Sequence, residues 1–332
     1  MRFGLFGGGR IGRRDPFGDS HRYEDFIEFI QQADRLGFES IFVVEHHFTG
    51  VGQISASLNL LSYFAGCTQK IRLGTAVVVL PWHDPALLAE QVATLDVLSR
   101  GRVDFGIGRG YRKAEFEQFC MPIEQAQERF DECVDFLLKA WTTEGRFSYE
   151  GKYCKYHDIV VEPEPEQRPH PPIWMAGGSP QSIERVAASN FNLLLDQVGS
   201  MALTFERLRI YLDTLEAHGL PRNAGRVGVA RGLHVVKTEA ERRVALERRA
   251  VTIKNIGELA RRPGSTEALV DDGALIGTPQ EIIDKLNRLA EGGVEYVLLT
   301  TAVATREALV EFAEDIMPHV HPAAAAPPLR AA

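Results

Sequence analysis

The stretch Ser40-Ile41-Phe42-Val43-Val44-Glu45-His46-His47-Phe48 joins a predicted strand to a cluster of reactive side chains. Residues 40–44 are β-branched, aromatic or small, which is typical of a strand buried on both faces. A glutamate and two histidines follow at the point where this strand ends. Because ligands bind at the ends of the strands in alternating β/α proteins, the stretch predicts a ligand site here.

On both sides of this strand, the chain alternates between apolar runs and amphipathic stretches. The apolar runs predict strands at residues 2–6, 40–45, 71–80, 102–108, 173–176, 192–196, 226–236 and 294–300. The amphipathic stretches predict helices at about 21–36, 54–68, 123–141, 180–188, 201–218, 238–260, 279–291 and 305–317. One more helix is predicted to begin after Asp84-Pro85 and to end at Gly101.

Two stretches interrupt this alternation, and a third ends it. Residues 147–170 hold interleaved tyrosines and a Glu-Pro repeat, which predict a hairpin or excursion, and the polar residues 261–277 predict a long loop. The Ala/Pro-rich residues 321–332 predict a disordered tail. We therefore predict an α/β fold, a single-domain (β/α)8 TIM barrel with insertions over residues 1–320. The alternative is a doubly wound sheet, which more often stops at about five to seven strands.

Charge and cysteine usage narrow the class of protein. The formal charge of −8 argues against nucleic acid or an anionic membrane as the main partner. The four cysteines show no metal-binding spacing, so we expect reduced thiols in a cytoplasmic protein. We also expect no signal peptide and no membrane-spanning segment, because a strand begins at residue 2 and no apolar run is long enough.

Three glycine-containing segments follow predicted strands. Residues 7–12 match a GxGxxG pattern, but residues 13–18 are loop-like, which disfavours a dinucleotide site. Residues 106–110 place Arg109 among glycines, which favours an anion site over simple pairing of Arg109 with an acid. Residues 176–182 open a helix, where Ser179 could bind an anion, cap the helix, or do both. In a barrel Arg109 and Ser179 lie at the ends of adjacent strands, so a phosphate could be bound from both sides.

Glu45, His46 and His47 allow three interpretations. A metal site is disfavoured, because neighbouring side chains of an extended segment alternate faces and no further ligand pattern accompanies them. Both histidines could be structural. We favour an acid/base or ligand-facing role for at least one of them and predict no metal.

Five segments together resemble the bacterial luciferase-like flavin monooxygenases. They are Glu45–Thr49, Leu73–Pro81, Gly101–Gly110, Arg2–Phe6 and Gly277–Pro279, and their order and spacing match the family over nearly the whole chain. The resemblance implies a (β/α)8 barrel that takes reduced FMN from a separate flavin reductase. It implies a monooxygenase in which O2 forms a flavin peroxide that oxygenates a small organic substrate.

The same resemblance assigns roles to individual residues. It implies that Arg109 holds the FMN phosphate with Gly178, Ser179 and Ser182, and that Thr75, Ala76 and Val77 line the isoalloxazine. It implies a cis peptide between Ala76 and Val77. His46 matches the acid/base histidine, and Glu45 its neighbour at the flavin ring.

Three further expectations come with the resemblance. Residues 261–277 match a mobile lid that excludes water, and family members are commonly homodimers through helices such as 54–68. The apolar stripe of Leu58, Leu61 and Phe64 on that helix equally fits a core. Gly108 stands where luciferase α subunits have a reactive cysteine, which argues against light emission and predicts a larger pocket.

Two other functions remain open from the sequence. One is a deazaflavin-dependent oxidoreductase of the same superfamily. The other is a non-catalytic flavin-binding subunit, against which the presence of Glu45, His46 and Arg109 argues. The loops that would set substrate specificity have no decodable pattern, so the substrate stays undefined.

Overall fold

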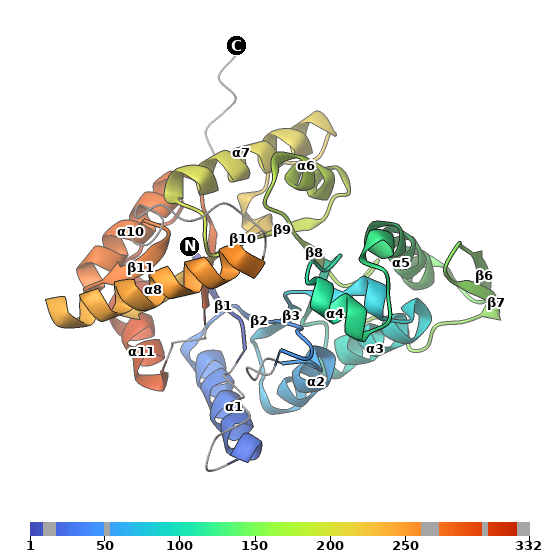
Figure 1. Ribbon diagram of the computed structural model, residues 1–332, viewed down its shortest axis with the longest axis horizontal. Helices are drawn as coiled ribbons and strands as arrows, with labels where there is room; N and C mark the ends of the chain where they lie inside the picture. Colours follow the sequence, from blue (N-terminus) through green and yellow to red (C-terminus); the bar gives the residue numbers. More distant parts are fainter. Residues whose placement is uncertain (9–17, 50–53, 260–271, 301–304, 324–332) are drawn as a thin grey trace. The chain divides into compact units, whose positions relative to one another are not determined.

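The computed structural model describes residues 1–8, 18–49, 54–259, 272–300 and 305–323. The large sheet contains β1 (Arg2–Phe6), β2 (Ser40–Val43), β3 (Arg72–Thr75), β5 (Val103–Gly108), β8 (Ile173–Ala176), β9 (Asn192–Leu195), β10 (Val227–Val235) and β12 (Tyr296–Thr300). Its strand order is β10-β12-β1-β2-β3-β5-β8-β9, and β10 also pairs with β9, which closes the sheet. The fold is therefore the predicted (β/α)8 barrel, and its eight strands are the eight that the sequence predicts (Figure 1).

Helices follow most of these strands. They are α1 (Gly18–Leu36), α2 (Ser57–Cys67), α3 (Pro85–Ser99), α4 (Lys113–Gln118), α5 (Ala126–Thr142), α6 (Pro180–Ala188), α7 (Met201–Ala217), α8 (Glu239–Leu259), α10 (Pro279–Glu291) and α11 (Arg306–Glu311). The bounds of α6 and α10 agree with the prediction at both ends. Each begins with a capping box and a proline in its first turn, which fixes the start of a helix sharply.

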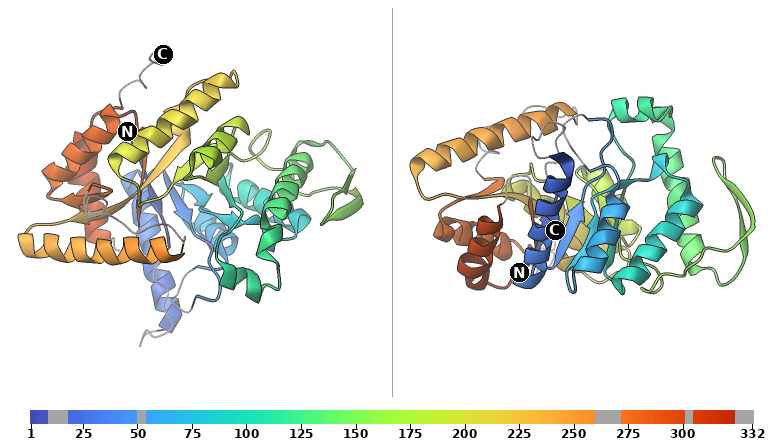
Figure 2. Two further views of the ribbon diagram at one scale, coloured as in Figure 1. Left: turned by 45° about the horizontal axis from the view of Figure 1, so that its top comes forward. Right: turned by 90° about the horizontal axis from the view of Figure 1, so that it is seen from below.

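The chain divides into two compact units. The first comprises residues 1–7, 32–40 and 175–332, and the second comprises residues 8–31 and 41–174. In the first unit β1, β10 and β12 form adjacent parallel strands, and Phe3 packs edge-on against Phe312 with ring centroids 5.1 Å apart. Figure 2 shows these strands and their helices from two further directions.

In the second unit α2 and α3 pack together beside β3 and β5. The apolar stripe of α2 belongs to the core, because Leu61 and Phe64 are fully buried. The predicted excursion contains an antiparallel hairpin of β6 (Phe147–Glu150) and β7 (Lys155–Ile159). The carboxylate of Glu132 on α5 accepts backbone N–H bonds from residues 152–154, so α5 holds the turn of this hairpin.

Several features differ from the sequence prediction. The predicted loop 261–277 ends in a short strand, β11 (Ala274–Gly277), which pairs with residues 232–235 of β10. The predicted strand 71–80 is divided into β3 and β4 (Val78–Val79) and is followed by a 3-10 turn, Leu80–Trp82. The helix α4 is absent from the prediction. Strand β2 ends at Val43, so Glu45 lies in the loop that follows.

Some predictions fall outside the described residues. They concern most of the GxGxxG segment, the lid as far as residue 271, and the tail from residue 324. No helix in the described part of the chain is long and apolar enough to cross a membrane.

Candidate active site

Glu45 is the centre of a hydrogen-bonded cluster after β2. Its side chain is buried, and the residue is only 4% exposed. Its Oε1 accepts hydrogen bonds from Nε2 of His47 and Nε2 of His83, both at 2.9 Å. Its Oε2 accepts the backbone N–H of Val79 at 2.8 Å. One carboxylate therefore ties the loop after β2 to β4 and the turn that follows it.

The surroundings of Glu45 keep its carboxylate ionised. Burial alone would raise the pKa of Glu45, but the hydrogen bonds from His47, His83 and Val79, with the charge of His83, outweigh burial and lower the pKa. The negative charge of the Glu45 carboxylate is thus stabilised by these three hydrogen-bond donors rather than by solvent.

His46 points away from this cluster and binds a second carboxylate. Its Nδ1 lies 3.2 Å from Oε1 of Glu115 on α4, and the same oxygen accepts the backbone N–H of His47 at 3.0 Å. Glu115 is 4% exposed. Burial would raise the pKa of Glu115, but the bonds from His46 and His47, the charge of His46 and the Arg112 guanidinium lower it.

This contact fixes the tautomer of His46. An ionised Glu115 accepts from Nδ1–H, so Nε2 of the neutral ring carries the lone pair. Among the described residues, Nε2 of His46 has no hydrogen-bond partner. The ring is therefore oriented by one nitrogen and open to a proton at the other.

An aromatic group borders these histidines. The ring of His47 packs edge-on against Trp82 and Phe119, at centroid distances of 5.5 and 4.9 Å. Phe119 also lies 5.1 Å from Phe48, which is 66% exposed. This apolar surface is therefore partly open to solvent at Phe48.

The peptide between Ala76 and Val77 is cis, as predicted. It lies between β3 and β4, which both pair with β5. At this break in the pairing, the Thr75 hydroxyl binds β5 instead. Oγ1 of Thr75 donates to the carbonyl of Gly106 at 2.7 Å and accepts from its N–H at 2.8 Å. The hydroxyl of Thr75 is therefore engaged with β5, whereas Ala76 and Val77 are partly exposed.

Glycines on β5 give this segment its space. A β-carbon at position 106 would lie 1.7 Å from the carbonyl oxygen of Thr75, so only glycine fits there. A β-carbon at position 108 would lie 2.3 Å from Cγ2 of Val77. The prediction that Gly108 enlarges the pocket is therefore wrong, because a methyl group of Val77 fills the place of the missing side chain.

Arg109 follows β5 and is exposed. Its Nη1 lies 3.4 Å from Oε1 of Gln127 on α5, and Gln127 donates in turn to both carboxylate oxygens of Asp131. Within the described residues Arg109 has no carboxylate partner. Its guanidinium therefore retains donors for an anion.

In the first unit, the loop before α6 is closed on itself. The N–H groups of Gly178 and Ser179 both donate to Oγ of Ser182 at 3.0 Å, and the N–H of Ser182 donates to Oγ of Ser179 at 3.2 Å. Ser179 thus caps the helix, as one of the two interpretations predicts. An anion at this loop would have to replace Ser182 Oγ as acceptor of the Gly178 and Ser179 N–H groups.

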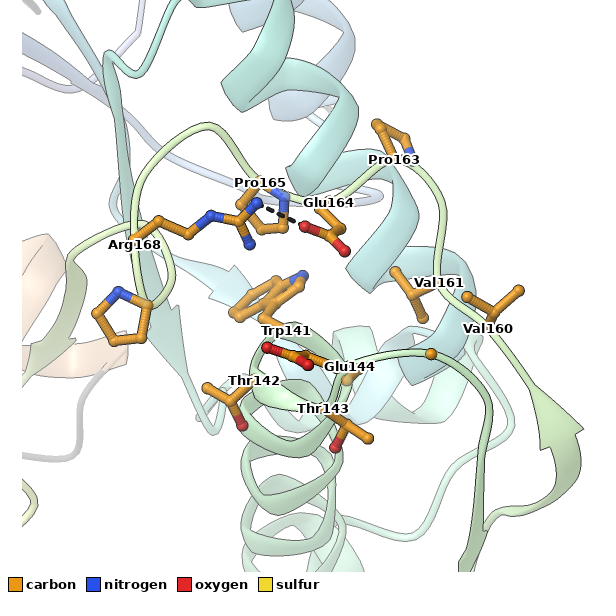
Figure 3. Close-up of a pocket in the computed structure, with 13 residues that line it drawn as sticks. Trp141, Thr142, Thr143, Glu144, Val160, Val161, Pro163, Glu164, Pro165 and Arg168 are labelled. Atoms are coloured by element: carbon orange, nitrogen blue, oxygen red, sulfur yellow. Dashed lines mark hydrogen bonds and ion pairs between the residues drawn. The ribbon is translucent and has the colours of Figure 1, made fainter.

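A cavity of about 540 Å³ lies in the second unit, between the end of α5 and the excursion (Figure 3). Trp141 lies at its centre, and the ion pair of Glu164 and Arg168 crosses one side. None of the residues predicted for the site lines this cavity. The cavity is therefore separate from the histidine cluster, by which we mean Glu45, His46, His47, His83 and Glu115.

Two residues that bind Glu45 or His46 were not predicted from sequence. Glu115 is 69 positions from His46, and His83 is 38 positions from Glu45. Both follow predicted strands, at 102–108 and 71–80. The strand-end rule that selects Glu45 could therefore have nominated them, although nothing in their local sequence indicates a partner.

A (β/α)8 barrel with acid–histidine pairs at a strand end has an architecture in which loops carry catalysis. A family model described as luciferase-like monooxygenase matches residues 1–296. The chain belongs to this family, as the sequence resemblance predicts.

Three similar proteins place the chain within the family. An uncharacterized protein of Sinorhizobium fredii (strain NBRC 101917 / NGR234) is 34% identical over 188 residues, which are 57% of this chain and 53% of that protein. The chain thus matches about half the length of that relative. The FMNH(2)-dependent dimethylsulfone monooxygenase of Pseudomonas putida is 28% identical over 296 residues, 81% of this chain and 80% of that protein. The monooxygenase RslO1 from Streptomyces bottropensis is 26% identical with a TM-score of 0.82, covering 96% of this chain and 99% of that structure.

Proposed function

We propose that this protein is an FMNH2-dependent monooxygenase that uses O2 to oxygenate a small organic substrate. The observation that carries the proposal is His46, fixed through Nδ1 by Glu115 and open at Nε2, in a chain of the luciferase-like monooxygenase family. The name of the Pseudomonas putida relative, an FMNH(2)-dependent monooxygenase, supports the choice of cofactor.

The residues after β3 and β5 fit a flavin. Arg109 offers a guanidinium that no carboxylate occupies within the described residues, which suits the FMN phosphate. Ala76 and Val77 offer a partly exposed backbone for the isoalloxazine. In the first unit, Gly178, Ser179 and Ser182 offer N–H and hydroxyl donors to a phosphate. Thr75 contributes through its backbone, since its hydroxyl is bound to Gly106.

Bound reduced FMN would supply the two electrons that activate O2. The role of His46 is to move a proton at Nε2 during oxygenation, while Glu115 keeps Nδ1 protonated. Glu45 holds His47 and His83 and keeps a fixed negative charge beside their imidazole rings. The aromatic group around Trp82 and Phe119 limits access of water to one side of the cluster.

The partners follow from this chemistry. A separate flavin reductase supplies reduced FMN in the cytoplasm. The protein acts as a homodimer. Tyr63 of α2 and Leu87 and Leu98 of α3 support a homodimer contact, because these apolar side chains are exposed on two helices that pack together. Light scattering on the purified chain measures the mass, and a monomer at micromolar concentration would exclude the dimer.

Anaerobic titration with reduced FMN and with a reduced deazaflavin tests the cofactor. We expect saturable binding of reduced FMN and at least tenfold weaker binding of the deazaflavin. The reverse preference would replace the proposal with the deazaflavin-dependent oxidoreductase. Absence of binding for both would reject either flavin function.

The Arg109→Met variant localises the flavin phosphate. We expect it to weaken FMN binding while riboflavin, which lacks the phosphate, binds as it does to the parent. Arg129→Met is the matched control, because Arg129 on α5 contacts Gln125 and the ring of Tyr153. Equal losses for FMN and riboflavin would show that Arg109 does not hold the phosphate.

A further inference from the structure

Three arginines are buried together in the first unit, apart from any residue used above. Arg207 on α7 is 7% exposed, Arg231 on β10 is 1% exposed and Arg249 on α8 is 3% exposed. Arginine is rarely buried this deeply unless a partner offsets its charge. The group, which we call the arginine cluster, therefore requires an account of its partners.

The three guanidinium groups meet around the loop between β9 and α7. Arg231 donates through Nη2 to the hydroxyl of Thr204. A β-carbon at position 199 would lie 3.2 Å from Nη1 of Arg207 and 3.7 Å from that same hydroxyl. Arg249 donates to the carbonyl of Gln197 and, at 3.2 Å, to its side-chain oxygen. All three arginines thus border residues 197–204.

Each guanidinium keeps a buried donor without an acceptor. The Nε atoms of Arg207, Arg231 and Arg249 are fully buried, and none has a hydrogen-bond partner among the described residues. A buried donor left without an acceptor destabilises the folded protein. Three arginines with such a donor border one loop, which suits a shared acceptor.

The three guanidinium groups of the cluster have two carboxylates nearby, those of Asp196 and Asp272. In the described part of the chain, neither Arg231 nor Arg249 has a carboxylate within ion-pair distance, and Arg207 lies 3.7 Å from Asp196. The nearby Asp272 binds the N–H of Met201 and lies 3.7 Å from Arg288. Burial and the charge of Arg249 lower the pKa of Arg231 to about 10, although the charges of Asp196 and Asp272 act in the opposite direction. Burial lowers the pKa of Arg249 to about 10 against the charge of Asp196. Both therefore remain cations at neutral pH.

Partly exposed residues lie beside the cluster. Residues 196–198 follow the end of β9 and are partly exposed, as is His234 near the end of β10. In a (β/α)8 barrel the loops after the strands carry the ligand site. The cluster therefore borders the loop after β9, at the end of the barrel where ligands bind.

We propose that Arg207, Arg231 and Arg249 bind the oxyanion head group, a carboxylate or a sulfonate, of the organic substrate. Planar guanidinium groups with free N–H donors suit such a group, because two oxygens accept two parallel hydrogen bonds. The substrate class is then an organic acid in its anionic form. This inference rests on the proposed monooxygenase function, whereas anion binding itself does not depend on it.

Calorimetric titration of the flavin-free, full-length protein tests the site. The probes are acetate, methanesulfonate and, as an uncharged analogue of acetate, acetamide, all at one ionic strength set with chloride. We expect saturable binding of acetate or methanesulfonate and none of acetamide. No saturable binding of either anion, or equal binding of acetamide, would overturn the proposal.

Repeating the titration with FMN and with riboflavin distinguishes substrate from cofactor phosphate. We expect the anion to bind in the presence of either flavin. Loss of anion binding with FMN but not with riboflavin would assign the cluster to the cofactor phosphate and overturn the substrate assignment. Neither titration measures turnover. Absence of anion binding would therefore not affect the result of the flavin titration, and absence of flavin binding would not affect the result of the anion titration.

Substitution locates the site within the protein. We expect Arg249→Met to weaken anion binding at least tenfold, with Arg249→Lys in between, since lysine keeps the charge but loses the planar fork. Arg222→Met is the matched control, because Arg222 is already paired with Asp213 and Glu216, and it should stay within twofold. Circular dichroism checks folding. Full anion binding by a folded Arg249→Met variant would overturn the assignment, and the parent titration stands if that variant does not fold.

Discussion

At the level of single residues, the proposed chemistry depends on one imidazole. His46 is held through Nδ1 by a buried carboxylate, which leaves Nε2 as its proton-accepting atom. His47, the next residue, turns to the opposite side and binds Glu45. Adjacent histidines therefore serve different carboxylates, as the alternation of an extended segment requires.

Removing His46 tests the proton-transfer role. We expect His46→Ala to lower the rate of oxygenated product formation about 10²-fold or more while reduced FMN binds unchanged. His21→Ala, an exposed histidine beside Asp25, is the control. An unchanged rate in His46→Ala would remove the acid/base assignment.

Glu115 tests the tautomer directly. Glu115→Gln presents an amide to His46, so the Nδ1–H is no longer required and the proton can move to Nε2. We expect a lower rate and a shifted pH–rate profile with unchanged FMN affinity, whereas Glu117→Gln, on the same helix and exposed, should match the parent. A lower rate with an unshifted profile would indicate a structural role only.

Glu45 connects the site to acid stability. Its folded pKa lies below the ordinary value of 4.5, so its contribution to stability is present above that value and is lost as the pH falls through the folded pKa. We expect Glu45→Gln to lower the free energy of unfolding at pH 7 by about 1–3 kcal/mol, and the difference from the parent to shrink below pH 4.5. Urea unfolding across this pH range measures it. A difference that stays constant with pH would show that ionised Glu45 is not the cause.

From sequence, a strand end marks the position of a candidate site residue, and the roles of these residues stay predictions. Glu45 and His46 follow the apolar run 40–44, and Arg109 follows a glycine-rich strand. Glu115 and His83 escaped notice, because their partners are distant in the chain and become neighbours only after folding. The arginine cluster escaped for the same reason, since α7, β10 and α8 each contribute a single arginine.

At the level of elements, the segment around the cis peptide depends on glycines in the neighbouring strand. Gly108 faces Val77, so a side chain there must displace a packed methyl group. We expect Gly108→Ala to lower the free energy of unfolding by about 1–3 kcal/mol through overpacking. Thermal unfolding would register this as a lower Tm.

A second substitution checks that cause. Val77→Ala removes the methyl group that a β-carbon at position 108 would meet, so we expect Gly108→Ala with Val77→Ala to regain much of the lost stability. Gly66→Ala is the control, since a β-carbon there has no neighbour within 4 Å. Additive losses in the double variant would show that Val77 is not the obstacle.

The β6–β7 hairpin depends on α5 through one carboxylate. Glu132 accepts the backbone N–H groups of residues 152–154. We expect Glu132→Ala to speed hydrogen exchange of these amides without changing FMN binding. Glu144→Ala, an exposed residue just past the end of α5, is the control. Unchanged protection of these amides would contradict the anchoring role.

Elements with a clear start or a long period could be predicted from sequence. Asp84, Ser179 and Thr278 each cap a helix that begins with proline, and these helices were found. The helix α4 and the strand β11 were missed, because six and four residues are too short to show a period. The apolar run 71–80 was predicted as one strand, because hydrophobicity does not reveal where the backbone turns.

At the level of the whole molecule, each of the two compact units carries candidate binding residues. The second unit carries the histidine cluster and Arg109, and the first carries the loop before α6 and the arginine cluster. The (β/α)8 fold itself serves many chemistries, so the fold alone defines no reaction. The family and the residues at the strand ends together support oxygenation by reduced FMN.

Rapid mixing of the anaerobic protein–FMNH2 complex with O2 tests this central claim most directly. The flavin absorbance is followed in parallel with that of free FMNH2 under the same conditions. The account predicts that the bound flavin reoxidises through a spectrally distinct phase, and that this phase changes in the His46→Ala variant. Reoxidation that is indistinguishable from that of free FMNH2 would contradict it.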